Sequence, residues 1–148
     1  MLSSSPKVVR EVPIEAVVIG ASAGGIEALQ VLMPPLSRNL RLPIIVVVHL
    51  PPRRKSLLPE LFTPLCAAPV AEPDDKQPIT GGGIWFAPPD YHLLIEGRSF
   101  ALSLEAPVHF SRPSIDVLFE SAAHAYGASL TGVVLSGASE DGALGASS

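Results

Sequence analysis

Two runs of consecutive apolar residues stand out near the beginning of the chain. Residues 16–19 read Ala-Val-Val-Ile and residues 44–48 read Ile-Ile-Val-Val-Val, with no polar residue in either run. Strands of a parallel sheet that are covered on both faces have this pattern, whereas half-exposed strands alternate. Between the two runs, apolar residues recur at helical spacing from Ile26 to Met33. This order predicts two adjacent parallel strands joined through a helix by a right-handed crossover.

The rest of the hydrophobic pattern predicts more elements of the same kind. Pro34 and Pro35 are expected to end the first helix, because proline disfavours helical backbone in the residue before it. The later elements are expected to be a helix over 56–66, a loop over 67–82 with a short strand near 78–80, strands over 83–87, 91–96 and 100–104, a helix that Ser114 caps and that ends before Gly127, and a buried strand over 130–135. The predicted fold class is α/β, doubly wound: a mainly parallel sheet flanked by helices, with a small antiparallel hairpin at 91–104.

The helix over 56–66 is expected to begin at Ser56 as its N-cap. Its apolar residues at helical spacing are predicted to face the core. They are Leu57, Leu58, Leu61, Phe62 and Leu65.

The length of 148 residues suits one domain that buries a core without disulfides. We expect residues 1–12 to form a flexible tail and residues 13–148 to form the domain. Cys66 is the only cysteine, so no intramolecular disulfide can form, which fits a reducing compartment. The first residues contain no apolar stretch of the kind that marks a secretory signal. These features together predict a cytoplasmic location.

Charge and hydropathy argue against two classes of partner. The net charge is −4 and no long basic stripe occurs, so nucleic acid is not an expected partner. Mean hydropathy is +0.39, and residues 121–139 carry no formal charge, but serine, threonine, histidine and glycine interrupt that stretch. It therefore does not resemble a membrane-spanning helix, and we expect no direct membrane insertion.

A glycine-rich turn with a single hydroxyl follows the first predicted strand. Gly20, Gly24 and Gly25 surround Ser22, and a helix is predicted directly afterwards. Such a turn opens at the carboxyl edge of a parallel sheet, where ligands bind. The turn can admit a pyrophosphate to the backbone, present Ser22 as a nucleophile beside backbone N–H groups, or simply let Ser22 cap the helix. The local pattern leaves these three uses open.

Two more strand ends bring reactive side chains to the same edge. His49 follows the second strand, and a turn with Glu140 and Asp141 follows the strand over 130–135. A hydroxyl, an imidazole and a carboxylate from separate strand ends form the arrangement that acyl transfer requires. In this hypothesis Ser22 attacks a carbonyl, His49 takes its proton and returns it to the leaving group, and Asp141 holds the imidazole. The residues expected to shape the turn or to offer N–H groups to the oxyanion are Ala23, Gly24 and Gly25.

Candidates for contact with the substrate come from two loops. His109 and Arg112 lie in an irregular loop over 106–113, and loops carry functional residues more often than core elements do. Arg53 belongs to the cluster Arg53-Arg54-Lys55 just after His49, where it can meet an acidic partner; a solvated basic surface is the competing interpretation. No two histidines have the spacing of zinc ligands, so we expect no metal and no cofactor.

Five segments of the chain occur in a characteristic order. They are Ile-Gly-Ala-Ser-Ala-Gly-Gly at 19–25, Val-His-Leu-Pro at 48–51, Phe-Ala-Pro-Pro-Asp-Tyr-His at 86–92, Arg-Pro-Ser-Ile-Asp-Val-Leu-Phe at 112–119 and Leu-Ser-Gly-Ala-Ser-Glu-Asp-Gly-Ala at 135–143. Together they resemble the catalytic domain of CheB-type chemotaxis methylesterases, from about residue 14 onwards. The resemblance implies hydrolysis of glutamate methyl esters on the cytoplasmic helices of chemoreceptors, often with deamidation of receptor glutamines. It also implies that Ser22, His49 and Asp141 match the family's catalytic triad.

The sequence departs from the usual family pattern in several ways. Ala23 stands where threonine is common and Ala138 where methionine is common. No receiver domain precedes the first strand, so the resemblance implies an esterase that stands alone. Family members continue beyond the position of Ser148, and we therefore expect the domain to be incomplete at its carboxyl end. A sheet edge left uncovered in this way would favour association with another chain.

Two other functions compete with hydrolysis. The segment over 20–26 also resembles the glycine loop of short-chain dehydrogenases, which suggests a nucleotide-binding, Rossmann-like domain. Against it, His49 occupies the place where an acidic or basic residue would contact the ribose, and neither Tyr91 nor Tyr126 is followed by lysine four residues later. The third hypothesis is a catalytically silent interaction module.

Overall fold

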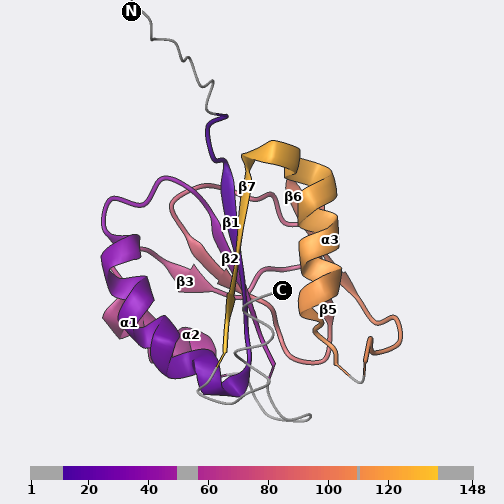
Figure 1. The fold of residues 1–148 in the computed structure, drawn as a ribbon, viewed down its shortest axis with the longest axis horizontal. Coiled ribbons are helices and arrows are strands. Elements are labelled where there is room, and N and C mark those ends of the chain that lie inside the picture. Colours follow the sequence, from indigo (N-terminus) through magenta and orange to yellow (C-terminus); the bar gives the residue numbers. More distant parts are fainter. Residues whose placement is uncertain (1–11, 50–56, 110, 137–148) are drawn as a thin grey trace, which may run out of the picture.

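The centre of the molecule is a parallel sheet of five strands. The computed structural model describes residues 12–49, 57–109 and 111–136. Within them the strands lie in the order β3-β4-β2-β1-β7, and every neighbouring pair is parallel (Figure 1). Their bounds are β1 Ala16–Ala21, β2 Ile44–Val48, β3 Val70–Ala71, β4 Ile84–Phe86 and β7 Leu130–Leu135. The predicted doubly wound α/β class is confirmed.

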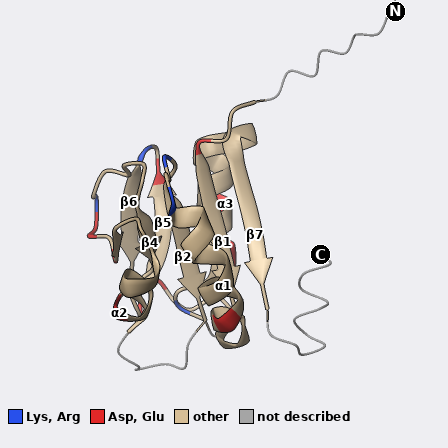
Figure 2. Ribbon diagram, turned by 90° about the vertical axis from the view of Figure 1, so that its left-hand side faces the viewer, with Lys and Arg blue, Asp and Glu red and all other residues tan. Residues whose placement is uncertain are grey.

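Strands β1 and β2 form the best-buried part of this sheet, as their apolar runs predict. They pair in register from Val17 opposite Ile44 to Ala21 opposite Val48. All five residues of β2 are buried, and in β1 only Val17 is partly exposed. Burying both faces of a strand stabilises the fold by about 1.5–3 kcal/mol for each large aliphatic side chain. Figure 2 shows that these central strands carry no charged residue and that β7 lies at one side of the sheet.

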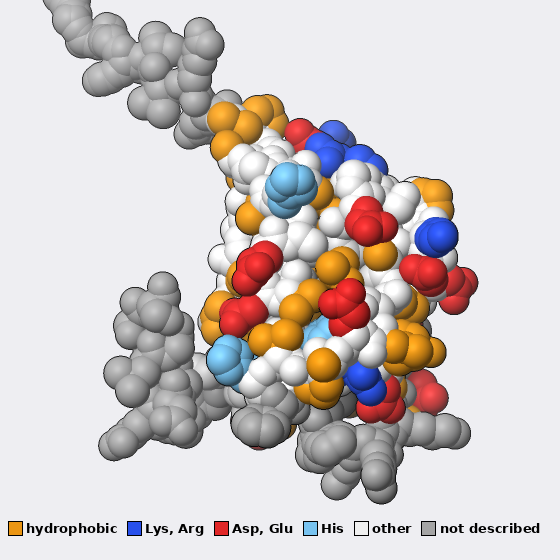
Figure 3. Space-filling view, turned by 90° about the vertical axis from the view of Figure 1, so that its right-hand side faces the viewer, with side chains coloured by type: hydrophobic (Ala, Val, Ile, Leu, Met, Phe, Trp, Pro, Cys, Tyr) orange, Lys and Arg blue, Asp and Glu red, His pale blue; other side chains and the backbone are white. Residues whose placement is uncertain are grey.

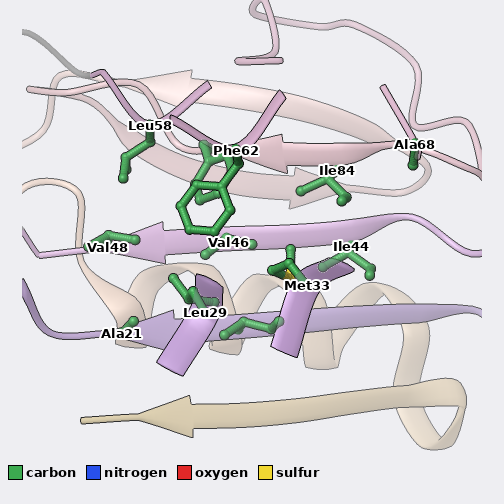
Figure 4. Close-up of a cluster of buried hydrophobic side chains, with 12 residues drawn as sticks. Ala21, Leu29, Met33, Ile44, Val46, Val48, Leu58, Phe62, Ala68 and Ile84 are labelled. Carbon is green, nitrogen blue, oxygen red and sulfur yellow. The ribbon is translucent and has the colours of Figure 1, made fainter. Parts of the chain in front are cut away.

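Alternate residues of β1 and β2 face two separate cores. On one face, α1 (Ile26–Ser37) and α2 (Leu58–Phe62) cover Ile19, Val46 and their neighbours, with Phe62 near the middle (Figure 4). On the other face, α3 (Ile115–Tyr126) and the hairpin cover Val18 and Val47. This alternation also sets the face towards which the residues after each strand end will project.

Helix α1 is longer than predicted, because Pro34 and Pro35 lie inside it and it ends at Ser37. Two prolines in the last turn remove only the hydrogen bonds to the carbonyls of Gln30 and Val31, and Val31 is exposed to water. In the same turn, the buried hydroxyl of Ser37 donates to the carbonyl of Pro34 at 2.7 Å and accepts from the backbone N–H of Ala67 at 2.9 Å, which fastens the end of α1 to the segment after η2. The prediction that the prolines end this helix was wrong.

The helix predicted over 56–66 is shorter and less buried than expected. It consists of α2 over Leu58–Phe62, followed by a 3₁₀ turn, η2, over Thr63–Leu65. Only two of the five predicted core residues are buried, namely Leu58 and Phe62. Pro59 and Pro64 restrict the backbone to these two short pieces, so the apolar residues do not share one continuous face. Ser56 lies outside the described residues.

The hairpin forms a sheet of its own and does not extend the parallel sheet. Its strands are β5, His92–Glu96, and β6, Ser99–Ser103, and they pair antiparallel across a turn with Gly97 in the left-handed region. The predicted short strand near 78–80 is only an isolated bridge from Pro78 to Ser99, whereas β3 over Val70–Ala71 was not predicted. A strand of two residues is too short to show a hydrophobic period.

Helix α3 confirms its prediction at both ends. The hydroxyl of Ser114 accepts a hydrogen bond from the backbone N–H of Val117 at 3.3 Å, and Gly127 follows the last residue with a φ of 57°. Its buried face consists of Leu118, Ala122 and Tyr126. Strand β7, which follows through the 3₁₀ turn η3 over Gly127–Ser129, is only partly covered, because it pairs with β1 alone among the described strands. The prediction that β7 is buried was therefore wrong.

Gly20 lets the first turn of α3 approach β1 closely, so we expect Gly20→Ala to destabilise the fold. A Cβ built at Gly20 would overlap the side chain of Ile115. Overpacking of this kind costs about 1–3 kcal/mol in free energy of unfolding. Urea denaturation of the single variants and of Gly20→Ala with Ile115→Ala tests the contact. The double variant should lose less stability than the sum of the two; strictly additive losses would show that the methyl group meets no obstacle there.

Candidate active site

Ser22 lies directly after β1, at the carboxyl edge of the sheet. Its N–H continues the ladder by donating to the carbonyl of Leu135 in β7 at 3.2 Å, and its own carbonyl accepts from Gly25 at 2.8 Å. These bonds lead into a short 3₁₀ turn, η1, over Ala23–Gly25. Ser22 occupies the N-cap position of that turn, but its side chain makes no capping hydrogen bond. The capping use of Ser22 is thus not seen, and its hydroxyl is available for another role.

The glycine at position 25 is required by close packing at this turn. A Cβ at Gly25 would lie 2.9 Å from the carbonyl oxygen of Leu135 and 3.2 Å from the Cβ of Ala21. Real side chains essentially never approach a backbone oxygen so closely. Gly25 therefore lets η1 pack against β1 and β7, which positions Ser22 at the end of its strand.

His49 lies directly after β2, beside Ser22. Its N–H donates to the carbonyl of Ala21 at 2.8 Å, so the pairing of β1 and β2 continues one step past the last ladder pair, Ala21 opposite Val48. Ala21 and Val48 face the core under α1, so the alternation predicts that the next residues turn towards the α3 face. The position of His49 agrees, because it lines a pocket together with residues of α3. Ser22 and His49 therefore follow the paired ends of β1 and β2, and of the two only His49 lines this pocket.

This pocket, which we call the rim pocket, has a volume of about 280 Å³. Its lining comes from the end of β2, the loop before α3, the first turn of α3 and β7. The lining residues are His49, Val108, His109, Ser111, Ser114, Ile115, Asp116 and Val134. Figure 3 shows the face of the molecule that carries α3 and the hairpin, where acidic and histidine side chains lie among exposed hydrophobic ones.

Burial lowers the pKa of the His49 imidazole, and a nearby carboxylate opposes that effect. Loss of water around the ring disfavours its protonated form, whereas the negative charge of Asp116 favours it; the burial effect is the larger of the two. The Nε2 atom of His49 is buried and has no hydrogen-bond partner within the described ranges. A neutral imidazole with an unpartnered nitrogen is suited to accept a proton.

His109 borders the rim pocket, and Arg112 does not. Val108 and Ser111 exchange two backbone hydrogen bonds of 2.9 Å, which holds the exposed His109 in the turn between them with a φ of 48°. The guanidinium of Arg112 instead donates to the carbonyl of Leu104 at 3.0 Å and to that of Glu105 at 3.3 Å. Arg112 thus ties the end of the hairpin to the loop before α3.

Two residues of the predicted site, Asp141 and Arg53, lie outside the described residues. Of the chain after β7, the structure describes only Ser136. Ala23, Gly24 and Gly25 are all placed, and they form η1. The structure thus brings Ser22, His49 and the turn residues to one edge.

Sequence reasoning overlooked Asp116, Ser111 and Ser114 as residues of this edge. The topology could have indicated Asp116 and Ser114, which belong to the first turn of α3 and to its N-cap. Because β7 is parallel to β1, the helix that precedes it must run back from the carboxyl edge of the sheet, so α3 begins where Ser22 and His49 lie (Figure 1).

The described residues lack two features that would point to other functions. No group of three or more His, Cys, Asp or Glu side chains in this part of the chain is arranged to hold a metal ion. Among the helices that the structure describes, none is long and apolar enough to cross a membrane.

Comparisons with known proteins point to one family. Residues 17–148 match the family model described as CheB methylesterase. A relative from Leptospira interrogans, provisionally named a protein-glutamate methylesterase/protein-glutamine glutaminase, is 45% identical over 132 residues, which are 88% of this chain and 68% of the relative. The protein-glutamate methylesterase/protein-glutamine glutaminase of Trichodesmium erythraeum is 38% identical over 139 residues, 91% of this chain and 40% of the relative.

A solved structure shows the same fold. The crystal structure of the Thermotoga maritima CheB methylesterase catalytic domain matches with a TM-score of 0.79 at 31% identity, covering 88% of this chain and 71% of that one.

The lowered pKa of His49 gives a prediction that requires no substrate. We expect the His49 ring to titrate below the ordinary histidine pKa of about 6.5, because burial disfavours the imidazolium. The same group makes folding stability fall with decreasing pH, since the unfolded chain binds the proton first. Histidine NMR titration, with His49→Gln to assign the signal, measures the value. A pKa above 6.5 would show that burial does not dominate at this ring.

Proposed function

The chain belongs to the CheB methylesterase family, and from that premise we propose that it is a serine hydrolase that removes methyl esters from glutamate side chains of chemoreceptors and deamidates receptor glutamines. The observation that carries the proposal is the bond from the His49 N–H to the carbonyl of Ala21, 2.8 Å long. It holds the backbone of His49 against the end of β1, one residue before Ser22, at the edge where a parallel sheet binds ligands. The names of the relatives supply the substrate class.

In the proposed mechanism, Ser22 is the nucleophile and His49 the general base. The imidazole takes the proton of the Ser22 hydroxyl as its oxygen attacks the ester carbonyl carbon. As the tetrahedral intermediate collapses, the imidazolium gives that proton to the leaving methoxide oxygen, which departs as methanol, or to the leaving amide nitrogen of glutamine, which departs as ammonia. Water repeats the two steps on the acyl-enzyme and releases the glutamate. Asp141, which the family resemblance assigns to the triad, holds the imidazole in its orientation.

The oxyanion of the tetrahedral intermediate is assigned to backbone N–H groups of η1. The N–H of Gly25 already donates to the carbonyl of Ser22. The first two N–H groups of a helical turn have no partner within the turn, so those of Ala23 and Gly24 are the donors available. An oxyanion donor is worth about 3 kcal/mol in comparable enzymes. Gly25 is then a residue that shapes the turn and not an oxyanion donor.

The substrate is expected to approach over the rim pocket. Its lining of imidazole, hydroxyl and aliphatic groups, with Asp116 as the one carboxylate among the described lining residues, suits a neutral ester or amide side chain. His109 is the residue of the pocket's outer loop that we propose to contact the receptor helix, and Arg53 is a second candidate. The proposed partner, the cytoplasmic helices of a methylated chemoreceptor, requires a cytoplasmic enzyme.

Ser22→Ala tests the nucleophile directly. Release of methanol from methylated receptor should fall by about 10³-fold or more, because without its nucleophile the site retains only binding and oxyanion stabilisation. Labelling of the protein by a fluorophosphonate probe should disappear as well.

The matched control is Ser103→Ala, a serine of β6 that is distant in sequence and whose hydroxyl accepts from the N–H of Glu105. This variant should release methanol at the rate of the unmodified chain. Unchanged methanol release in Ser22→Ala would remove Ser22 from the mechanism.

A further inference from the structure

The first turn of α3 is fixed against the strand that carries Ser22. Ser114 caps the helix through Val117, and Ile115 packs on the backbone of Gly20, two residues before Ser22. Asp116 follows Ile115 and is therefore held near the carboxyl edge of the sheet by contacts on either side of it. Its own side chain is exposed and lines the rim pocket.

Asp116 and His49 approach the rim pocket from different elements. Asp116 comes from α3, His49 from the end of β2, and His109 from the loop before α3. These three are the titratable groups of the pocket lining that the structure describes, and Asp116 is the acidic one among them. Asp116 is therefore the one carboxylate in the described lining of the pocket that His49 also lines.

We propose that Asp116 is a positioning residue for the hydrolysis, whose carboxylate faces His49 across the rim pocket and stabilises the imidazolium that forms when Ser22 gives up its proton. This inference rests on the proposed function. In this inference Asp116 is a second charged partner for the His49 imidazolium. The first, Asp141, is assigned by the family resemblance alone.

The physical basis is the positive charge of the His49 ring, which exists only after the ring has taken the proton of Ser22. The neutral imidazole that begins the reaction has no net charge to interact with the carboxylate, whereas the imidazolium attracts it. An interaction made only after proton transfer lowers the barrier without strengthening substrate binding. The pKa of His49 reflects the same attraction, since Asp116 raises it against the larger effect of burial.

An alternative role for Asp116 is purely structural. It lies in the first turn of α3, where a negative charge is stabilised by the helix dipole. Glu120 lies one turn later on the same helix, is also exposed, and does not line the rim pocket. Glu120→Gln thus removes the same charge from the same helix and is the matched control for Asp116→Asn.

The test measures His49 in the full chain by histidine NMR titration and measures kcat/KM for methanol release against pH. In Asp116→Asn, the His49 pKa should fall further, the acid limb of the profile should move with it to lower pH, and kcat should drop about two- to fivefold with little change in KM. Asp116→Glu should keep the His49 pKa near that of the unmodified chain. The effects should weaken as salt is added, because the carboxylate is exposed.

Two outcomes would overturn the inference. One is an unchanged His49 pKa in Asp116→Asn, and the other is an equal shift in Glu120→Gln, which would indicate a general charge effect of α3. The titration requires no esterase activity, so it separates this inference from the proposed function. If the proposed function itself is wrong, Ser22→Ala will release methanol at the rate of the unmodified chain.

Discussion

The parallel ladder between β1 and β2 is the constraint on which the site depends. Its last bond, from the N–H of His49 to the carbonyl of Ala21, lies beyond the final pair of the ladder. The ladder can hold a fixed register because both strands are buried on both faces, and slipping by one residue would place apolar side chains on the wrong core. Hydrophobic burial in the middle of the sheet thus determines which two polar residues follow its paired central strands at one edge.

Much of the fold could be predicted because its central strands are uniformly apolar. β2 was predicted with its observed bounds, and the Ser114 cap and the end of α3 before Gly127 were also predicted. The errors occur where local rules compete with tertiary contacts. Pro34 and Pro35 lie inside α1, whose last residue, Ser37, is buried and hydrogen-bonded to Pro34 and Ala67, and no sequence rule indicates that partnership.

The candidate site could be predicted in part, for a related reason. Strand ends are visible in sequence, so Ser22 and His49 could be assigned to one edge before their neighbours were known. Asp116 could not be found in the same way, because it belongs to a helix start that meets the edge only through the direction of β7. The effect of burial on the His49 ring likewise depends on the loop over 108–111, whose path has no periodic signal.

Strand β7 contributes to the reactive turn through its backbone rather than its side chains. The carbonyl of Leu135 accepts the Ser22 N–H, and the same oxygen leaves no room for a side chain at Gly25. Val134, beside it, is 41% exposed, and β7 has a neighbour on one side only among the described strands. A displacement of β7 would therefore reach the backbone of Ser22 and the packing of Gly25 through one carbonyl group, so this strand fixes the shape of the turn as well as one edge of the described sheet.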